Sequence, residues 1–501
     1  MRARPRSSNS SSPGRCYVDT FAREGLPPRE RWPDLLLLDY PPRLNAAEEL
    51  LKHEGTAIAN GWSYAELAER ADAIAGALHI EPGARVLLHS PNTPEAIAAW
   101  LGILLAGGIV VATMPLLRAR EIDKVVAKAR VDKAVVAREL AAEVNVKERL
   151  ILEDLPTQGW FDACDTAADD VAIIAFTSGT TGEPKGCVHF HRDLLACCDT
   201  FAARVLDPQP SDVFSGSPPI AFTFGLGASL LFPLRFGAAT APTSPPQLLE
   251  TLHTQRVTTL FTAPTAYRAL LREPLPDSLH TCVSAGEPLP AGVSDAWLEK
   301  TGIRIVDGIG STEMLHIFIA SPASEAKAGS CGRPVPGYEA RIVDDAMRTL
   351  PPGEVGRLAV RGPTGCRYLD DPRQTAYVRD GWNLTGDAFS MDADGYFWFQ
   401  ARTDDMIISA GYNISGFEVE AALLEHPSVK ECAVVGVPDE QRGHVVKAWV
   451  VPAAPVEVGA LQDFVKARIA PYKYPRRVEF LDALPRTPTG KVQRNVLRER
   501  G

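Results

Sequence analysis

The stretch Phe176-Thr-Ser-Gly-Thr-Thr-Gly-Glu-Pro-Lys-Gly186 carries the sharpest local signal in the sequence. It follows an apolar run typical of a buried strand, and it contains four hydroxyl side chains, three glycines and one lysine. Glycines let the backbone approach a ligand closely, so successive N–H groups can point into one concavity, to which the hydroxyls and Lys185 add donors. The Walker A pattern GxxxxGK[ST] cannot be fitted here. We therefore predict a polyphosphate-binding loop of another type, since a flexible surface turn has no use for so many donors.

Strands and helices alternate on both sides of this loop. Apolar runs typical of buried strands are Arg85–His89, Gly108–Ala112, Val171–Phe176, Thr258–Thr262 and Ile303–Val306, and the helical pattern is found at Ala65–Leu78 and Pro94–Leu105. Strands separated by helices of this length predict parallel sheets that are covered on both faces.

The pattern changes after about residue 329, where short strands are separated by Pro, Gly and Asp turns. The strands Arg341–Val343, Gly356–Arg361 and Tyr396–Gln400 predict a β subdomain at about residues 330–403. After Asp404, helices at Glu418–His426 and Leu461–Ile469 mix with strands at Cys432–Val437 and Val445–Val451. The fold class is therefore predicted as α/β, with a large N-terminal domain at residues 17–403 and a small α+β domain at residues 404–501.

Composition excludes several classes of protein. Of the 501 residues, 45% are hydrophobic and 23% are charged, which is the mixture of a folded chain rather than a disordered one. Lys and Arg number 52 against 62 Asp and Glu, a net charge of −10, which argues against binding to nucleic acid or to an anionic membrane. The longest apolar runs are shorter than the ~18 residues that indicate a membrane helix.

Cysteine usage and the N-terminus bear on the compartment. The nine cysteines are scattered and contain no CxxC pair, which predicts free thiols in a reducing cytoplasm and argues against a zinc site. The first fifteen residues carry four arginines and no acid, so an organellar transit peptide is conceivable, but they have neither an apolar face nor the apolar stretch of a secretory signal. We predict a disordered tail at residues 1–16.

The loop resembles the nucleotide loop of the adenylate-forming superfamily, which includes acyl-CoA synthetases, peptide-synthetase adenylation domains and luciferases. Further motifs of that superfamily follow in order at Pro219–Gly225, Ser284–Glu287, Gly308–Glu313, Gly381–Asp387, Arg402–Asp404 and Leu484–Lys491. The resemblance extends from about residue 17 to the C-terminus. Asp307–Phe318 is similar to benzoate-type aryl-CoA ligases, and Gly362–Asp371 and Tyr396–Arg402 are most similar to 2-aminobenzoate–CoA ligases.

The resemblance implies roles for individual residues. It places ATP against Thr177, Ser178, Gly179, Thr180, Thr181, Gly182, Lys185, Gly286, Glu287, Asp307, Gly308, Ile309, Gly310, Asp387 and Arg402. Thr312 is expected at the α-phosphate, Glu313 at Mg²⁺, and Asp387 with Arg402 at the ribose. Lys491 is expected to bridge the substrate carboxylate and the α-phosphate. The small domain is expected to be mobile and to pivot at Asp404, with Gly411 lining the channel for the CoA thiol.

The substrate pocket is expected to involve Phe222, Tyr267, Gly310 and His316. Many relatives place His where Phe222 stands, and this exchange is consistent with a flat, apolar acid. His316 could line this pocket or could be a hydrogen-bonded histidine of the core, and Tyr267 could form a pocket wall or pack on its own helix. Relatives often place Tyr where Ile309 stands, so adenine would rest on backbone and aliphatic surface here.

Three functions are compatible with these motifs. The first is an ATP-dependent aryl-carboxylate–CoA ligase that forms AMP and pyrophosphate and uses ATP, Mg²⁺ and CoA, with 2-aminobenzoate or a benzoate-like acid as substrate. The alternative is a freestanding adenylation enzyme that loads an aryl acid onto an acyl carrier protein; no carrier domain follows Lys491, which favours CoA. The third, a non-catalytic nucleotide-binding scaffold, is disfavoured by the intact motif residues. The sequence leaves both a monomer and a homodimer open.

Overall fold

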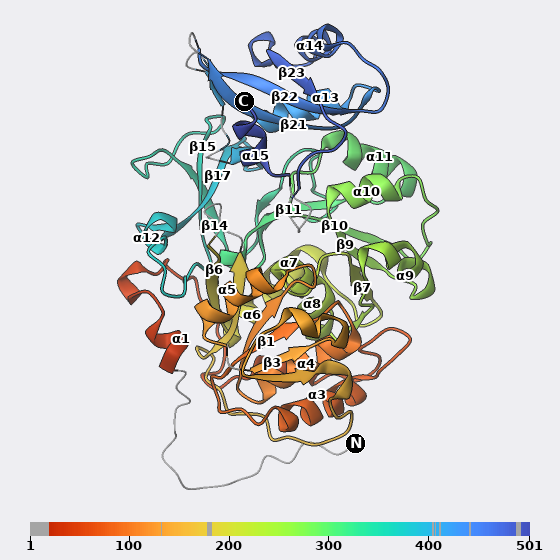
Figure 1. Ribbon diagram of the computed structural model, residues 1–501, viewed down its shortest axis with the longest axis vertical. Helices are drawn as coiled ribbons and strands as arrows, with labels where there is room; N and C mark the ends of the chain where they lie inside the picture. Colours follow the sequence, from red (N-terminus) through yellow and green to blue (C-terminus); the bar gives the residue numbers. More distant parts are fainter. Residues whose placement is uncertain are drawn as a thin grey trace.

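The computed structural model describes residues 20–131, 133–177, 183–402, 405, 407–409, 412–439, 442–486 and 492–501. The described strands form three sheets before residue 403 and a further sheet after it. Figure 1 shows the elements α13 and α14 of the last part at one end of the molecule and α3 at the opposite end. The prediction of an α/β fold with parallel sheets is confirmed, whereas the predicted tail at residues 1–16 lies outside the described residues.

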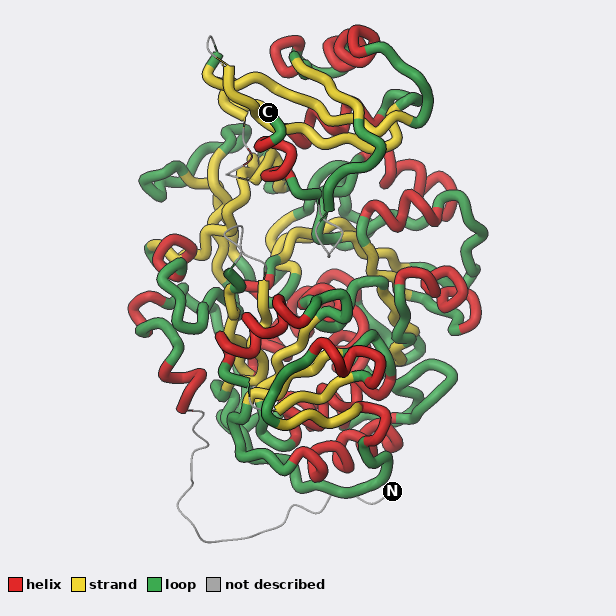
Figure 2. The backbone as a smooth tube through the Cα atoms, in the orientation of Figure 1, coloured by secondary structure: helices red, strands yellow, loops and turns green. Residues whose placement is uncertain are grey.

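The first sheet has the strand order β4-β3-β1-β2-β5-β6. Its strands are β1 (Arg85–His89), β2 (Ile109–Thr113), β3 (Lys133–Val136), β4 (Glu148–Ile151), β5 (Val171–Thr177) and β6 (Lys185–Phe190). Neighbouring strands run parallel except β5 and β6, which pair antiparallel. The accompanying helices are α2 (Ala46–Leu51), α3 (Tyr64–Leu78), α4 (Pro94–Leu105), α5 (Ala119–Ala129) and α6 (His191–Cys197), and Figure 2 shows red helices around these yellow strands.

Local sequence explains where the central helices begin. The hydroxyl of Thr93 accepts a hydrogen bond from the N–H of Ala96 at 3.1 Å, and Pro94 occupies the first turn, where its missing N–H is not needed. Ser63 and Glu66 form a reciprocal capping box at the start of α3. Residues 96–105 of α4 are all buried, so this helix lies in the core rather than on the surface.

The second sheet has the strand order β13-β12-β11-β10-β9-β7-β8. Its strands are β7 (Val213–Gly216), β8 (Ala239–Thr240), β9 (Thr259–Thr262), β10 (Thr281–Ser284), β11 (Val306–Gly310), β12 (Ile317–Ala320) and β13 (Arg333–Pro334). The strands from β8 to β11 are parallel, and β12 and β13 are antiparallel to their neighbours. The helices here are α7 (Thr223–Leu226), α8 (Phe232–Arg235), α9 (Leu248–Thr254), α10 (Pro264–Leu270) and α11 (Ala291–Thr301), together with π-helical segments at Cys198–Leu206 and Gly227–Leu231.

The predicted strand Ile303–Val306 is wrong in its position. The strand begins where the prediction ended and runs over Val306–Gly310. Its residues Asp307, Gly308 and Gly310 have low β propensity, so the local sequence gives no strand signal. Pairing with β10 on one side and β12 on the other makes this segment extended.

The third sheet contains only antiparallel pairs within the described residues, in the order β14-β15-β17-β16 with β18 paired to β17. Its strands are β14 (Glu339–Val343), β15 (Gly356–Arg361), β16 (Val378–Arg379), β17 (Trp382–Met391) and β18 (Phe397–Arg402). Short helices elsewhere are α1 (Thr20–Glu24) and α12 (Gln374–Tyr377), and 3-10 turns lie at Arg29–Arg31, Arg138–Glu143, Leu152–Asp154, Pro245–Gln247, Thr312–Met314 and Pro471–Lys473.

The last part of the chain forms a sheet of order β20-β19-β22-β21, with β23 paired to β22. Its elements are β19 (Ile407–Ser409), β20 (Tyr412–Ile414), α13 (Gly416–Leu424), β21 (Val429–Asp439), β22 (Gly443–Pro452), α14 (Val458–Lys466), β23 (Arg477–Phe480) and α15 (Arg494–Glu499). An apolar cluster that includes Leu423, Val434 and Leu461 is separate from the cores of the N-terminal sheets.

One large apolar core joins the first three sheets. It contains Leu88 of β1, Phe261 of β9 and Leu358 of β15, all nearly inaccessible to solvent. Because protein cores are close-packed, the edges where these sheets meet are held in fixed positions. Every cysteine in the described part of the chain has an unpaired thiol, and none of the described helices is both long and apolar enough to cross a bilayer.

Candidate functional site

The predicted phosphate loop connects β5 to β6 as an antiparallel hairpin. Thr177, the last residue of β5, is paired in register with Lys185, the first residue of β6. Several predicted site residues lie outside the described residues, namely Ser178, Gly179, Thr180, Thr181, Gly182, Asp404, Gly411 and Lys491. The remaining predicted residues can be placed.

Lys185 and Glu313 are joined through the hydroxyl of a tyrosine that the sequence analysis did not single out. The Lys185 ammonium donates to the Tyr368 oxygen at 3.1 Å, and the Tyr368 hydroxyl donates to Oε1 of Glu313 at 2.5 Å. The direct distance from Lys185 Nζ to Glu313 Oε1 is 3.9 Å. Burial and the nearby Glu313 carboxylate raise the pKa of Tyr368, so its hydroxyl keeps its proton at neutral pH.

Tyr368 is brought to this place by a short extended segment that pairs with β6. The N–H of Val188 donates to the carbonyl of Arg367 at 2.8 Å, and the N–H of Leu369 donates to the carbonyl of Gly186 at 2.8 Å. Tyr368 itself forms an antiparallel bridge with Cys187. The segment therefore extends the sheet edge that ends at Lys185.

Thr312 and Glu313 sit on a 3-10 turn, Thr312–Met314, directly after β11. The Ser311 hydroxyl caps this turn by accepting from the N–H of Met314 at 3.2 Å. Behind the turn, the ring of His189 lies 2.7 Å from the carbonyl oxygen of Thr312. The main chain that carries the expected α-phosphate ligand is thus anchored to a buried side chain.

His189 belongs to a buried charged cluster with Asp193 and Arg367. Arg367 donates to Oδ2 of Asp193 at 2.7 Å, and both side chains are fully inaccessible to solvent. Burial alone would raise the pKa of Asp193, but the Arg367 guanidinium holds it below its ordinary value. Burial lowers the pKa of His189 to about 4, so its imidazole is neutral. His189 therefore has a structural role, as does His191, whose Nδ1 accepts from the N–H of Ala46 at 3.1 Å.

Asp387 and Arg402 come from paired positions of β17 and β18. Nη1 of Arg402 donates to Oδ1 of Asp387 at 2.8 Å, and Asp387 is only 7% exposed. Burial raises the pKa of Asp387 despite the lowering effect of Arg402, and the charge of Glu313 raises it further. Gly386 has φ +78°, a left-handed conformation that favours glycine, and it lets the Arg402 guanidinium lie close to the main chain of β17.

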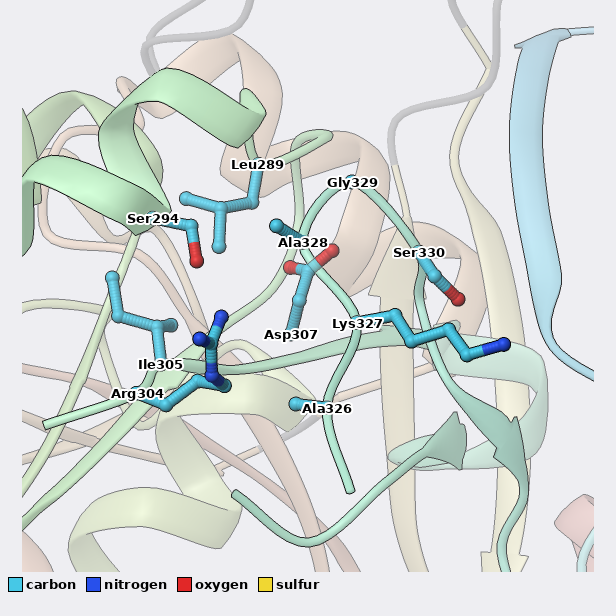
Figure 3. Close-up of a pocket in the computed structure, with 10 residues that line it drawn as sticks. All are labelled: Leu289, Ser294, Arg304, Ile305, Asp307, Ala326, Lys327, Ala328, Gly329 and Ser330. Atoms are coloured by element: carbon cyan, nitrogen blue, oxygen red, sulfur yellow. The ribbon is translucent and has the colours of Figure 1, made fainter. Parts of the chain in front are cut away.

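The predicted adenine segments line neighbouring strands of the second sheet. Gly286 and Glu287 follow β10, and Asp307, Gly308, Ile309 and Gly310 form β11. Burial raises the pKa of Asp307, and its Oδ1 has no hydrogen-bond partner among the described residues. Figure 3 shows this carboxylate in a small pocket beside Ala328, with Ser294 and Leu289 on the side of α11.

The predicted acyl-pocket residues lie on two parts of the chain. Phe222 lies at the start of α7, whereas Gly310 and His316 lie at the two ends of the segment that joins β11 to β12. Phe222 is half-buried and immediately precedes α7. Gly310 packs against the hairpin's own backbone, since a Cβ there would lie 2.6 Å from the carbonyl oxygen of His316. A Cβ on Gly227, a residue that the sequence analysis did not single out, would lie 2.4 Å from Nε2 of His316.

His316 is neither an open pocket wall nor a hydrogen-bonded core histidine. Its ring is 2% exposed and packs against the rings of Phe201, Phe224, Phe232 and Phe261 at centroid distances of 4.5–6.5 Å. Neither ring nitrogen makes a hydrogen bond of good geometry within the described part of the chain. Burial lowers its pKa to about 3, so the ring is neutral at physiological pH.

Tyr267 is not brought to the site. Its hydroxyl donates to the carbonyl of Val283 at 2.9 Å, and its ring packs edge-on against Trp297 at 4.8 Å. It is fully buried in the cluster between the second sheet and α11. The position is that of a core residue rather than of the pocket wall suggested by the sequence.

A divalent metal ion would fit the acidic end of this arrangement. Mg²⁺ is usually held by one or two carboxylates together with substrate phosphates and water. Glu313, 8% exposed and linked through Tyr368 to Lys185 at the start of β6, provides such a carboxylate. Within the described residues, no group of three or more His, Cys, Asp or Glu side chains could hold a metal ion, so the phosphates would have to supply other ligands.

Two protein-family models match long stretches of the chain. The family model for AMP-binding enzymes matches residues 50–367, and the model for the C-terminal domain of AMP-binding enzymes matches residues 418–491. The chain is 37% identical to an uncharacterized acyl–CoA ligase of Bacillus subtilis (strain 168), over 88% of this chain and 90% of that protein. It is 35% identical to the benzoate–CoA ligase of Thauera aromatica, over 91% of this chain and 96% of that protein.

Solved structures of two CoA ligases are also similar to this chain. The anthranilate CoA ligase AuaEII, solved with anthranoyl-AMP, is similar with a TM-score of 0.86 and 31% identity, covering 92% of this chain and 98% of that one. A benzoate CoA ligase from Burkholderia xenovorans LB400 is similar with a TM-score of 0.83 and 33% identity, covering 91% of this chain and 100% of that one.

Proposed function

This chain belongs to the AMP-binding enzyme family, and from that premise we propose that it is an ATP-dependent aryl-carboxylate–CoA ligase that forms an acyl-adenylate and then a CoA thioester. Its membership of the adenylate-forming superfamily, near the benzoate and anthranilate CoA ligases, is confirmed. An acyl- or aryl-CoA ligase activity is supported by these relatives. The preference for 2-aminobenzoate or a benzoate-like acid is our proposal.

The observation that carries the proposal is that Lys185 lies beside Glu313, with Asp387 near enough for the charge of Glu313 to raise its pKa. Lys185 begins β6, Glu313 follows β11, and Asp387 lies in β17. Lys185 lies 3.9 Å from Glu313, and the charge of Glu313 acts on the pKa of Asp387. A cation for phosphates, a carboxylate for a metal ion and a carboxylate for a diol are what ATP requires of a binding site.

In the first half-reaction, an oxygen of the substrate carboxylate attacks the α-phosphorus of ATP, and pyrophosphate leaves with the electrons of the broken P–O bond. Two anions approach each other in this step, so catalysis must be largely electrostatic. We assign the phosphates to Lys185, Thr177 and the loop residues 178–182. Thr312, held by His189 behind it, is assigned to the α-phosphate, and Lys491 to the bridge between the phosphate and the carboxylate.

Mg²⁺, when bound, would neutralise phosphate charge, and Glu313 is the residue assigned to hold it. Asp387 is assigned to the ribose hydroxyls, because an ionised carboxylate can accept from both, and Arg402 orients it. Adenine is assigned to the surface formed by Gly286, Glu287 and the strand Asp307–Gly310. The unpartnered oxygen of Asp307 would accept a hydrogen bond from an amino group.

In the second half-reaction, the CoA thiol attacks the acyl carbon, the acyl–phosphate bond breaks, and AMP leaves while the thiol proton passes to solvent or to AMP. We assign the pivot of the C-terminal domain to Asp404 and the thiol channel to Gly411. The unpaired thiols of the buried cysteines support a reducing compartment such as the cytoplasm.

The acyl pocket is assigned to Phe222 and Gly310, and His316, which is 2% exposed, is assigned to the aromatic core next to it rather than to its wall. Phe224 also faces His316 at a ring distance of 5.8 Å, and it contributes an apolar ring that the sequence analysis did not single out. Apolar rings favour a flat aryl acid over a polar one. This combination favours benzoate or 2-aminobenzoate.

The test is pyrophosphate release by the purified protein across a panel of acids. Benzoate, 2-aminobenzoate, hydroxybenzoates and aliphatic acids of similar size are compared in the presence of ATP and Mg²⁺. CoA and an acyl carrier protein are then compared as thiol acceptors. The proposal expects aryl acids to be preferred and CoA to accept the acyl group. Preference for an aliphatic acid, or transfer of the acyl group only to the carrier protein, would contradict the proposal.

A further inference from the structure

We propose that Tyr368 is a positioning residue that keeps Lys185 and Glu313 apart, so that the ammonium remains available to the phosphates and the carboxylate to Mg²⁺. The proposal rests on the proposed function, because it needs ATP and Mg²⁺ to bind where Lys185 and Glu313 lie. The hydroxyl of Tyr368 accepts from Lys185 at 3.1 Å and donates to Glu313 at 2.5 Å.

The direction of these two hydrogen bonds is fixed by charge. A lysine ammonium can only donate and an ionised carboxylate can only accept, so one neutral hydroxyl satisfies both. The Tyr368 residue is 1% exposed, and a phenolic hydroxyl is neutral at physiological pH. Tyr368 therefore acts as a neutral spacer between two opposite charges.

The spacer is held rigidly from several sides. The N–H of Tyr368 donates to Oε1 of Gln374 at 2.9 Å, and Gln374 donates in turn to the carbonyl of Cys366 at 3.1 Å. The ring packs edge-on against Tyr377 at 5.8 Å and lies beneath Lys185, whose Nζ is 5.1 Å from its centroid. A ring held in this way places its hydroxyl at one fixed point.

Removing the hydroxyl should let the two charges meet. Lys185 Nζ and Glu313 Oε1 are already within 3.9 Å, and both side chains are mostly withdrawn from water, so their attraction is weakly screened. In a direct ion pair the ammonium would be oriented away from a phosphate and the carboxylate would be partly neutralised. ATP and Mg²⁺ would then have to break that pair before they could bind.

The experiment is a double-mutant cycle on nucleotide binding. Tyr368→Phe, Glu313→Gln and the double variant are compared with the wild type by calorimetric titration with ATP, in excess Mg²⁺ and in EDTA, without an acid substrate. Tyr368→Phe should weaken Mg·ATP binding by about tenfold or more, which is the effect of losing a hydrogen bond to a charged group. In the Glu313→Gln background the same change should alter the affinity by less than about twofold, because no carboxylate remains to capture the lysine.

The control is Tyr64→Phe, which also removes a buried hydroxyl, one that donates to the carbonyl of Ala238 at 2.8 Å far from the site. Melting temperatures are recorded for every variant, and Tyr368→Met, which also lacks the hydroxyl, enters the cycle if Tyr368→Phe does not fold. Equal affinities for Tyr368→Phe and Tyr64→Phe, or additive effects of Tyr368→Phe and Glu313→Gln, would overturn the proposal. A wild type that binds no ATP would overturn the proposed function itself, which is a different result.

Discussion

A substitution of Asp387 should weaken nucleotide binding without lowering the stability of the fold. The substitution Asp387→Asn keeps the volume of the side chain but removes its charge, so the residue can no longer accept hydrogen bonds with both oxygens. If Asp387 holds the ribose, losing one charge-assisted hydrogen bond weakens nucleotide binding by about 1.5–3 kcal/mol. At 1.4 kcal/mol per factor of ten, the Kd for ATP should rise about 12- to 140-fold.

The same substitution should leave the stability of the unliganded protein intact. Burial raises the pKa of Asp387 above its ordinary value, so the folded state favours the protonated carboxyl, and ionisation at neutral pH opposes folding. The partner Arg402 is 51% exposed on its side chain, so it remains hydrated when the pair is lost, and that loss is worth less than about 1 kcal/mol. The melting temperature at pH 7 should therefore be unchanged or higher in Asp387→Asn.

The sign of the pH dependence follows from the direction of the shift. Because the folded-state pKa is the higher one, Asp387 contributes its stability below the unfolded pKa of about 3.9 and loses it as the pH rises. Any advantage of Asn over Asp in melting temperature should thus shrink as the pH is lowered toward 4. Calorimetric titration with ATP and thermal melts from pH 4 to pH 8 measure both effects. A normal Kd for ATP combined with a clear fall in melting temperature would refute the reasoning.

Three other substitutions test neighbouring parts of the molecule. Gly310→Ala places a Cβ 2.6 Å from the carbonyl of His316, and kcat/KM for the aryl acid should fall at least about tenfold; unchanged steady-state kinetics would remove Gly310 from the pocket. Arg367→Met leaves Asp193 buried without its cation and should destabilise the protein by about 3–5 kcal/mol at pH 7, with a smaller deficit at lower pH. Denaturant titration checks this, and an equal deficit at pH 5 would contradict it. Phe222→His should weaken apolar aryl acids in competition assays, and an unaltered acid preference would count against its role.

The elements that the sequence predicted well are those whose signals are local. β1 and α4 were predicted with the bounds that the structure gives them, because Pro91 ends the first and Thr93 with Pro94 begins the second. β11 was misplaced, since its glycines and aspartate carry no strand propensity and only its neighbours make it extended. The π-helical segments around His316 were not predicted, because nothing in an apolar run distinguishes a π-helix from an α-helix.

The residues of the site also divide into those with a local sequence signal and those whose role depends on distant partners. Lys185, Glu313 and Asp387 could be identified because each lies in a motif that is recognisable in isolation. Tyr368 could not, because its function depends on partners that are 183 and 55 residues away in the chain and that only folding brings to its hydroxyl. Tyr267 illustrates the converse, since an aromatic residue within the short helix α10 gives no sign of which side it faces, and the structure places it in the core.

The two-step reaction through an acyl-adenylate is the central claim, and it can be observed in a single turnover. Purified protein is mixed with 2-aminobenzoate, ATP and Mg²⁺ in the absence of CoA, and the products are analysed by mass spectrometry before and after CoA is added. The account predicts 2-aminobenzoyl-AMP and pyrophosphate before the addition, and 2-aminobenzoyl-CoA and AMP after it. Formation of ADP and phosphate, or a thioester that appears without any preceding adenylate, would contradict it.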